Sequence, residues 1–120
     1  MVQADPMSCW KKVINQETFM SINATVSGNT AIINMTGRFD FNVQREFKEA
    51  YDPQLANAAI NAIEVNLAGV NYLDSSALGM LLMLRERTTA VGKNLKLCNP
   101  TISVAQILEI ANFSKLFTIE

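Results

Sequence analysis

The most constraining feature of this sequence is the alternation of short strand-like and helix-like segments that begins at Met20. Residues 20–26 alternate apolar and polar side chains with a period of two, as a half-buried strand does. The segment Ser27-Gly28-Asn29 has the composition of a tight turn, and a second strand is predicted over residues 30–36. We therefore predict an antiparallel hairpin, which Gly37 is expected to end. The apolar residues expected on the buried face of the first strand are Ile22, Ala24 and Val26.

A helix and a third strand are predicted next. Asn42 is placed to cap a helix. The buried face of that helix is predicted to carry Val43, Phe47, Ala50 and Tyr51. The pair Asp52-Pro53 is expected to interrupt it, because proline lacks the backbone N–H, and helix is expected to resume over residues 55–62. Alternation predicts a strand through Ile63, Val65 and Leu67, followed by a loop over residues 69–74.

The C-terminal half continues the alternation. Ser75-Ser76 opens a long helix that we expect to end at Gly92, a residue type common just after helices. A short strand over residues 95–98 follows, and Ser103 is placed to cap a last helix. The buried side of that helix is predicted to carry Val104, Ile107, Leu108 and Ala111. Residues 117–119 are too few for an assignment.

The predicted order of elements is β-β-α-β-α-β-α. Strands that alternate with helices require crossover connections and hence parallel pairing, to which the opening hairpin adds an antiparallel edge. We predict one α/β domain over residues 20–120, with a mixed, mostly parallel sheet of four to five strands and helices packed on it. Residues 1–19 show no clean period and are predicted to form an N-terminal arm or an extra element.

The chain contains no histidine, which excludes many kinds of active site. Ser-His-Asp triads, Cys-His dyads, histidine-ligated zinc and imidazole bases all require that residue. The two cysteines, Cys9 and Cys98, lie far apart and form no CxxC pair, which favours a reducing compartment. We therefore expect a binding or regulatory module that is not an enzyme and that uses no cofactor and no metal.

Charge and hydropathy exclude two classes of partner. Ten Lys and Arg balance eleven Asp and Glu, and the basic residues form no stripe, so we expect no nucleic-acid partner. The longest apolar run covers residues 77–84, whereas a membrane-spanning helix needs about 20 residues. The N-terminus also lacks the pattern of a signal peptide. These features predict a cytoplasmic protein without direct membrane insertion.

The segment Asp74–Gly79, with the sequence Asp-Ser-Ser-Ala-Leu-Gly, is the strongest candidate site. It follows the third predicted strand and opens a helix, and function in α/β sheets concentrates where strand C-termini meet helix N-termini. Free backbone N–H groups and the positive end of the helix dipole make such a place favourable for a phosphate. Helix capping by Asp74, Ser75 or Ser76 explains the same residues without any function.

Apolar residues beyond the core stripe suggest a docking surface beside this segment. The core stripe of the helix is predicted to consist of Ala77, Met80, Leu81, Leu84, Thr88 and Val91. Leu78, Leu82 and Met83 lie outside it, and Gly79 would leave the space above Ser76 open. We hypothesise a small apolar docking patch next to an accessible serine. Alternatively, the two leucines pack under neighbouring loops.

Several motifs in the same order resemble those of the STAS family, in particular its anti-sigma-factor antagonists. The segment Asp74–Gly79 resembles the family's D-S-S-G-L-G phosphorylation motif, and Gly37–Asp40 resembles the G-E-L-D turn after the second strand. Residues 63–67 are similar to the family's third strand, and the spacing to Gly92 and the final helix also fits. The resemblance covers about residues 20–120.

The resemblance implies a phosphorylation switch that binds proteins. Ser76 corresponds to the serine that accepts phosphate from a partner kinase, and a serine phosphatase resets the switch. The unphosphorylated form would bind an anti-sigma factor or serine kinase, and phosphorylation would release it. Asp74 is expected to help position Ser76 or to contact the kinase, and Asp40 to line the same rim. For each aspartate the alternative is a purely structural role as a helix cap, Asp40 before Asn42 and Asp74 before the long helix.

Two residues depart from the family pattern, and two other functions stay open. Ala77 replaces a glycine, which would add a methyl near the phosphoacceptor, and Arg38 replaces an acidic residue. One alternative is a STAS interaction subunit of a lipid or anion transport system, in which the serine is only a cap. Another is nucleotide or small-ligand binding at the same helix start, which no glycine-rich loop supports.

Overall fold

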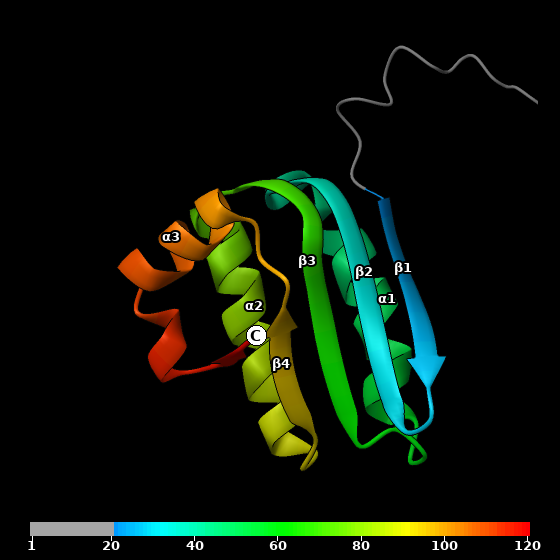
Figure 1. Cartoon of the computed structure of the whole chain (residues 1–120). Coiled ribbons are helices and arrows are strands. Elements are labelled where there is room, and N and C mark those ends of the chain that lie inside the picture. Colours follow the sequence, from blue (N-terminus) through cyan, green and yellow to red (C-terminus); the bar gives the residue numbers. More distant parts are fainter. Residues whose placement is uncertain (1–20) are drawn as a thin grey trace, which may run out of the picture.

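The computed structural model describes residues 21–120, which form a five-stranded sheet in the order β1-β2-β3-β4-β5 with helices packed on it (Figure 1). The strands are β1 (Ser21–Ser27), β2 (Thr30–Phe39), β3 (Ala62–Leu73), β4 (Asn94–Cys98) and β5 (Thr118–Ile119). The helices are α1 (Gln44–Ala56), α2 (Ser75–Ala90) and α3 (Ile102–Ile110), with 3-10 turns η2 (Phe41–Val43) and η3 (Phe113–Lys115). β1 is antiparallel to β2 and all other pairs are parallel, which confirms the predicted mixed α/β fold. The arm predicted for residues 1–19 lies outside the described residues.

The predicted hairpin is confirmed, with pairing from Ser21 opposite Thr36 to Ser27 opposite Thr30. Gly28 adopts φ 64° in the two-residue turn, a conformation that favours glycine. Val26 departs from the prediction, because 56% of its surface is exposed. It lies at the turn end of an edge strand, where less of the helical layer covers it.

Two glycines predicted to end strands lie within strands instead. β2 continues through Gly37 to Phe39, and the pairing of β2 with β3 shifts register on either side of this region. With φ 101°, Gly37 accommodates the irregularity as a bulge. β3 likewise runs through Gly69 to Leu73, where a loop was predicted. A Cβ on Gly69 would lie 2.5 Å from Thr36 Cγ2 and 2.9 Å from the Met35 carbonyl oxygen, so this glycine marks a close backbone approach.

The predicted break at Asp52-Pro53 and the predicted helix over residues 55–62 are both wrong. α1 continues through Pro53 to Ala56, and the chain then turns into β3. A proline this close to the helix end removes one hydrogen bond, while buried Phe47 and Tyr51 hold the helix on the sheet. After the helix, the Asn57 side chain accepts from the Ala59 N–H at 2.9 Å and closes a turn.

The last helices begin and end close to their predicted positions, with a different cap for α3. α2 covers residues 75–90 and Gly92 follows it, as predicted. The cap of α3 is Thr101, whose Oγ1 accepts from the Val104 N–H at 3.3 Å, so Ser103 lies inside the first turn. Val104 and Leu108 are buried as predicted. None of the helices within residues 21–120 has the length and apolar character needed to cross a bilayer.

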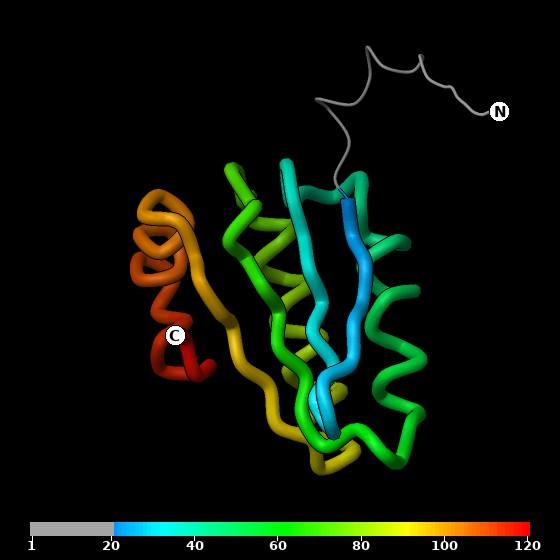
Figure 2. The backbone as a smooth tube through the Cα atoms, turned by 45° about the vertical axis from the view of Figure 1, so that its right-hand side comes forward, coloured from blue at the N-terminus to red at the C-terminus, as the bar shows by residue number. Residues whose placement is uncertain are grey.

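One face of the sheet carries the helical layer, in which α1 and α2 lie side by side (Figure 2). Successive right-handed crossovers that advance in one direction along the sheet place their helices on the same face. The two helices are also joined by Asp52, which pairs with Lys48 at 2.6 Å and with Arg87 at 3.6 Å. The largest fully buried side chains are Ile33, Met35, Phe39, Phe47, Ile60, Ile63, Val65, Leu67, Leu81, Leu84, Leu97 and Leu108.

The other face carries a row of asparagine side chains across the strands. The Asn34 amide donates to Asn23 Oδ1 at 3.2 Å and accepts from Asn66 Nδ2 at 3.0 Å. Asn99 Nδ2 donates to Asn66 Oδ1 at 3.5 Å. These cross-strand bonds satisfy polar groups on the half-buried face and help to hold the strand register.

Candidate functional site

Two aspartates mark the edge of the sheet where neighbouring strands end and helical segments begin. Phe39 of β2 pairs with Leu73 of β3, so the residues that follow, Asp40 and Asp74, leave the same edge. Asp40 Oδ1 accepts from the Asn42 N–H at 3.0 Å and caps η2, which confirms the capping role considered for Asp40, whereas Asn42 is not the cap. Asp74 Oδ1 accepts from the Ala77 N–H at 2.9 Å and caps α2. Both carboxylates therefore order helix starts.

The first turn of α2 presents two serines with different surroundings. Ser75 is exposed, whereas Ser76 is half-buried and lines a groove toward α1. The N–H groups of the first helical turn have no acceptor within the helix, and only that of Ala77 is used by the Asp74 side chain. The remaining N–H groups and the helix dipole favour an anion at this place.

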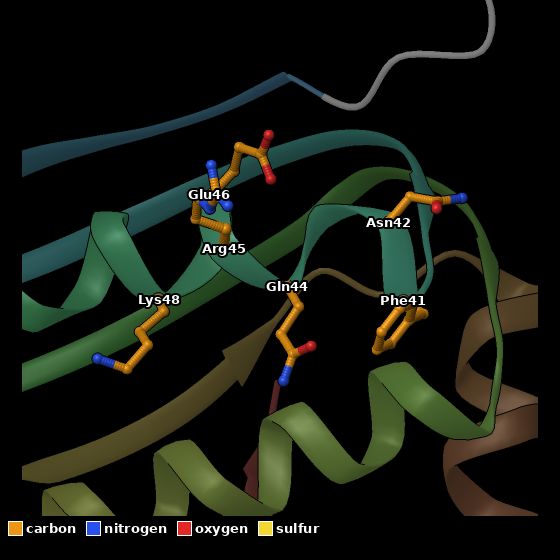
Figure 3. Close-up of a pocket in the computed structure, with 6 residues that line it drawn as sticks. All are labelled: Phe41, Asn42, Gln44, Arg45, Glu46 and Lys48. Atoms are coloured by element: carbon orange, nitrogen blue, oxygen red, sulfur yellow. The ribbon is translucent and has the colours of Figure 1, made fainter.

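A shallow groove of about 310 Å³ separates the start of α2 from the start of α1. We call it the Ser76 groove; it is lined by Phe41, Gln44, Ser76, Gly79, Met80 and Met83. The side chains of Phe41 and Gln44 point toward α2 (Figure 3). A Cβ on Gly79 would meet no atom within 4 Å, so the missing side chain leaves the groove open.

The apolar wall of the Ser76 groove differs from the predicted docking patch. Met83 is 49% exposed, but Leu78 and Leu82 are half-buried and pack against the core. Phe41, which sequence reasoning missed, is 65% exposed and supplies the opposite wall. No periodic pattern in the sequence indicates its exposure, because Phe41 lies in the short η2 turn between β2 and α1. The apolar surface beside Ser76 therefore combines one predicted residue with one that was not predicted.

Ala77 does not alter the surface of the site. Its side chain is fully buried in the core, with 0% exposure. The methyl group that replaces the family glycine is therefore next to Ser76 in the sequence but packs into the core, away from the surface of the site. The cause is the helix geometry, which turns Ala77 away from the exposed side of the first turn.

Arg38 compensates part of the negative charge at this edge. Its Nε lies 3.6 Å from Asp40 Oδ2, and its guanidinium lies 4.2 Å from the centroid of the Tyr72 ring. Strand register places Arg38 opposite Tyr72. The ring and the carboxylate together hold the cation. Since the Asp40 side chain is only 15% exposed, Asp40 contributes to the rim chiefly through its cap and this ion pair.

A larger hollow than the Ser76 groove surrounds the start of α1 and is open to solvent. Its volume is about 600 Å³, and it is lined by Phe41, Asn42, Gln44, Arg45, Glu46 and Lys48 (Figure 3). Gln44 points toward α2, while Arg45 and Glu46 point to the opposite side of the helix. Side chains that diverge around a helix do not converge on one small ligand.

Residues 21–120 contain no group of acidic or cysteine side chains placed to hold a metal ion. Cys98 is a free thiol whose Sγ lies 3.7 Å from Glu64 Oε1. Burial, followed by the neighbouring Glu64 carboxylate, raises the pKa of this thiol. Cys98 is therefore protonated at neutral pH and poorly suited to act as a nucleophile. Cys9 lies outside the described residues.

Comparison with known proteins identifies the domain. The model of the STAS domain family matches residues 21–120. A STAS-domain containing protein of Pseudomonas aeruginosa (strain UCBPP-PA14) is 40% identical over 102 residues, which cover 83% of this chain and 99% of the relative.

Solved structures share the fold at low sequence identity. The anti-sigma factor antagonist SpoIIAA in its unphosphorylated form is 19% identical, with a TM-score of 0.70 over 83% of this chain and 88% of that chain. The phosphorylated form of Bacillus SpoIIAA is 18% identical, with a TM-score of 0.65 over 83% and 91% of the two chains. A sulfate transporter family protein from Wolinella succinogenes is 18% identical, with a TM-score of 0.66 over 77% and 74%. From the matched family model and the 40% identical relative, this chain belongs to the STAS domain family.

Proposed function

We propose that this protein is a phosphorylation-controlled protein-binding switch of the anti-sigma-factor-antagonist type. In its unphosphorylated form it binds an anti-sigma factor or serine kinase, and phosphorylation of Ser76 releases that partner. A serine phosphatase restores the binding form. The observation that carries this proposal is the position of Ser76, at the anion-favouring start of α2 and in the wall of the Ser76 groove. The fold shared with SpoIIAA, which has been solved in both phosphorylation states, supports it.

The charge of the phosphate and the cost of desolvating it explain why phosphorylation would release the partner. A phosphate adds about −1.5 to −2 charges at neutral pH. On Ser76 it would lie in the same groove as Phe41 and Met83, whose exposed apolar surface suits a partner's apolar side chains. A partner that covers this groove would have to desolvate the new charge close to the Asp74 carboxylate. Because the helix start supplies N–H donors to the phosphate, the fold itself need not change.

The partners supply the chemistry of this proposed cycle. The chain contains no histidine to act as a general base, and STAS domains are generally regulatory. We therefore propose a non-enzymatic, cytoplasmic protein that serves as the substrate of a serine kinase and of a phosphatase, without a cofactor or nucleic-acid partner.

Phosphorylation is tested on the protein isolated from its native cells, with the modified residue located by fragment mass spectrometry. Phosphate is expected on Ser76 in the wild type, lost in Ser76→Ala and retained in Ser75→Ala, the matched control. Under conditions in which the phosphorylated wild type releases its partner, Ser76→Ala is expected to stay bound to that partner. Co-purification measures this difference. Phosphate on Ser75, or a Ser76→Ala variant that cannot bind, would contradict the switch.

A second candidate is an interaction subunit of a lipid or anion transport system that is not phosphorylated. The observation in its favour is the fold shared with the Wolinella sulfate transporter family protein. The same experiment separates the two functions. Absence of phosphate from both serines, together with equal partner binding by wild type and Ser76→Ala, would favour the transport role.

A further inference from the structure

In the part of the chain that the structure describes, β1 forms one edge of the sheet, and its own residues lack the features that usually protect an edge. Within residues 21–120 its neighbour on one side is β2, and its other side is unpaired. Edge strands are commonly protected by charged residues, proline, bulges or short length. The seven residues Ser21–Ser27 include no charge and no proline, and their pairing with β2 shows no register shift. At the opposite edge, β5 has only two residues.

The hairpin geometry determines which backbone groups of β1 face outward. A two-residue turn with glycine at its first central position closes on a hydrogen-bonded pair, here Ser27 and Thr30. Hydrogen-bonded and non-hydrogen-bonded pairs alternate along an antiparallel ladder. The N–H and C=O groups of Ile22, Ala24 and Val26 therefore point away from β2. Three donors and three acceptors are available at this edge.

These outward groups are complementary to a second copy of themselves. In antiparallel pairing about a two-fold axis through Ala24, Ala24 pairs with Ala24 of the other copy and Ile22 pairs with Val26. All six donors and acceptors on each strand edge are then satisfied. A shift of two residues leaves some of them unpaired, and a shift of one residue places apolar side chains opposite polar ones.

The side chains of β1 would also match those of the second copy across the two-fold axis, on both faces of the sheet. Ile22 and Val26 lie on the face that carries the helices, where each extends the apolar surface of the other. Asn23 and Thr25 lie on the open face, where both contact Asn34. Their pairing would extend the polar row into the second sheet. No charged side chain of β1 would be brought opposite a like charge, because the segment Ser21–Ser27 contains none.

We propose that the β1 edge is a homodimerisation surface, on which two copies pair antiparallel about Ala24 to form one continuous sheet. We assign a second copy of the chain to this edge because the edge is self-complementary in its backbone groups and its side-chain faces and carries no charge that would repel an identical strand. A seven-residue strand pair is a small interface. The dimer is therefore expected to form at micromolar or higher concentrations.

Sedimentation velocity of the full-length protein, measured over a range of concentrations, tests this proposal. The wild type is expected to change from monomer to dimer mass as concentration rises. Val26→Lys places a charge opposite Ile22 of the partner copy and is expected to weaken dimerisation by about tenfold or more. Val91→Lys is the matched control, since Val91 is 51% exposed and lies at the end of α2. Thermal melting followed by circular dichroism verifies that both variants fold.

Cross-linking tests the register. In a background with Cys9→Ser and Cys98→Ser, Ala24→Cys is expected to form an intermolecular disulfide under mild oxidation, because paired Cα atoms lie about 5.5 Å apart. Ser27→Cys is the control, because its counterpart would lie roughly 20 Å away, six residue steps along the strand. A wild type that stays monomeric at every concentration overturns the proposal. So does a Val26→Lys variant that dimerises like the wild type, or Ser27→Cys cross-linking more readily than Ala24→Cys.

Discussion

Gly79 lowers the stability of α2 and at the same time leaves the surface beside Ser76 open. A glycine within a helix costs about 0.5–1 kcal/mol relative to alanine. Here it lies in the second turn of α2, where an added Cβ would meet no atom within 4 Å. The space left open is part of the Ser76 groove. Packing does not require a glycine at this position, because a larger side chain would meet no neighbouring atom. The loss of helix stability is therefore consistent with a role of Gly79 at the surface.

We predict that Gly79→Ala stabilises the protein and weakens partner binding. The free energy of unfolding is expected to rise by about 0.5–1 kcal/mol, because alanine restricts the unfolded chain and favours the helix. The new methyl group would project into the Ser76 groove. It would therefore reduce the affinity of the unphosphorylated protein for its partner. Urea unfolding and a binding titration measure the two effects. A destabilised variant, or one with unchanged affinity, contradicts this assignment.

Asp74 combines a structural and a proposed functional role. Its carboxylate accepts from the Ala77 N–H, and its own N–H donates to the Phe39 carbonyl oxygen at 3.4 Å. The first bond orders the start of α2, and the second joins that start to the end of β2. Both bonds hold Ser76 in position relative to the η2 turn that carries Phe41. The capping interpretation and the positioning interpretation of Asp74 therefore describe the same hydrogen bonds.

At the scale of elements, the pairing of β2 with β3 depends on a close backbone contact. Thr36 of β2 lies opposite Gly69 of β3, next to a register shift. The Met35 carbonyl oxygen and the Thr36 side chain occupy the space that a Cβ on Gly69 would need. The backbone oxygen cannot move away without disturbing the central strand pair.

We predict that Gly69→Ala destabilises the protein by about 1–3 kcal/mol, as overpacking of a well-packed site usually does. Urea unfolding of Gly69→Ala and Gly79→Ala side by side provides the measurement. The same chemical change is expected to lower stability at one glycine and to raise it at the other, because only Gly69 lacks room for a methyl group. Equal free energies of unfolding for Gly69→Ala and the wild type would contradict the prediction. They would show that β2 and β3 can move apart enough to accommodate a methyl group at little cost.

The predicted positions of the elements failed where tertiary packing overrode a local signal. Glycines at 37 and 69 and the proline at 53 were expected to end elements. In each case the element continues, because paired strands or a buried helix face outweigh the local cost. Helix α2 was predicted closely, since its cap and the following glycine indicate the same limits. Val91, predicted on its buried stripe, instead lies past the last helical residue and is 51% exposed.

For the whole molecule, the arrangement of elements separates two surfaces. η2 and the starts of α1 and α2 form the Ser76 groove, whereas the proposed dimer edge belongs to β1. Gln44 and Phe41 face α2, while Arg45 and Glu46 lie on the opposite side of α1 (Figure 3). A dimer through β1 would thus keep two Ser76 grooves available.

We predict that dimerisation and partner binding are independent. Val26→Lys is expected to bind the unphosphorylated form's partner with unchanged affinity per chain and in a 1:1 complex. The wild type at high concentration is expected to form a complex with two copies of each protein. Light scattering of the purified complexes gives their masses, and calorimetric titration gives the affinities. A loss of partner affinity in a folded Val26→Lys variant would show that the two surfaces are coupled.

The sequence by itself determined the fold class, the opening hairpin, the long helix α2 and the serine pair at its start. These features depend on periodicity, turn chemistry and capping, which act between residues close together in the chain. Only the tertiary structure decided that Phe41 and Met83 line the same Ser76 groove, that the Ala77 methyl is buried and that, within residues 21–120, the outer edge of β1 is unpaired. Those features depend on contacts between segments far apart in the sequence. Local periodicity describes which face of an element is apolar, but packing alone decides which part of that face another element covers.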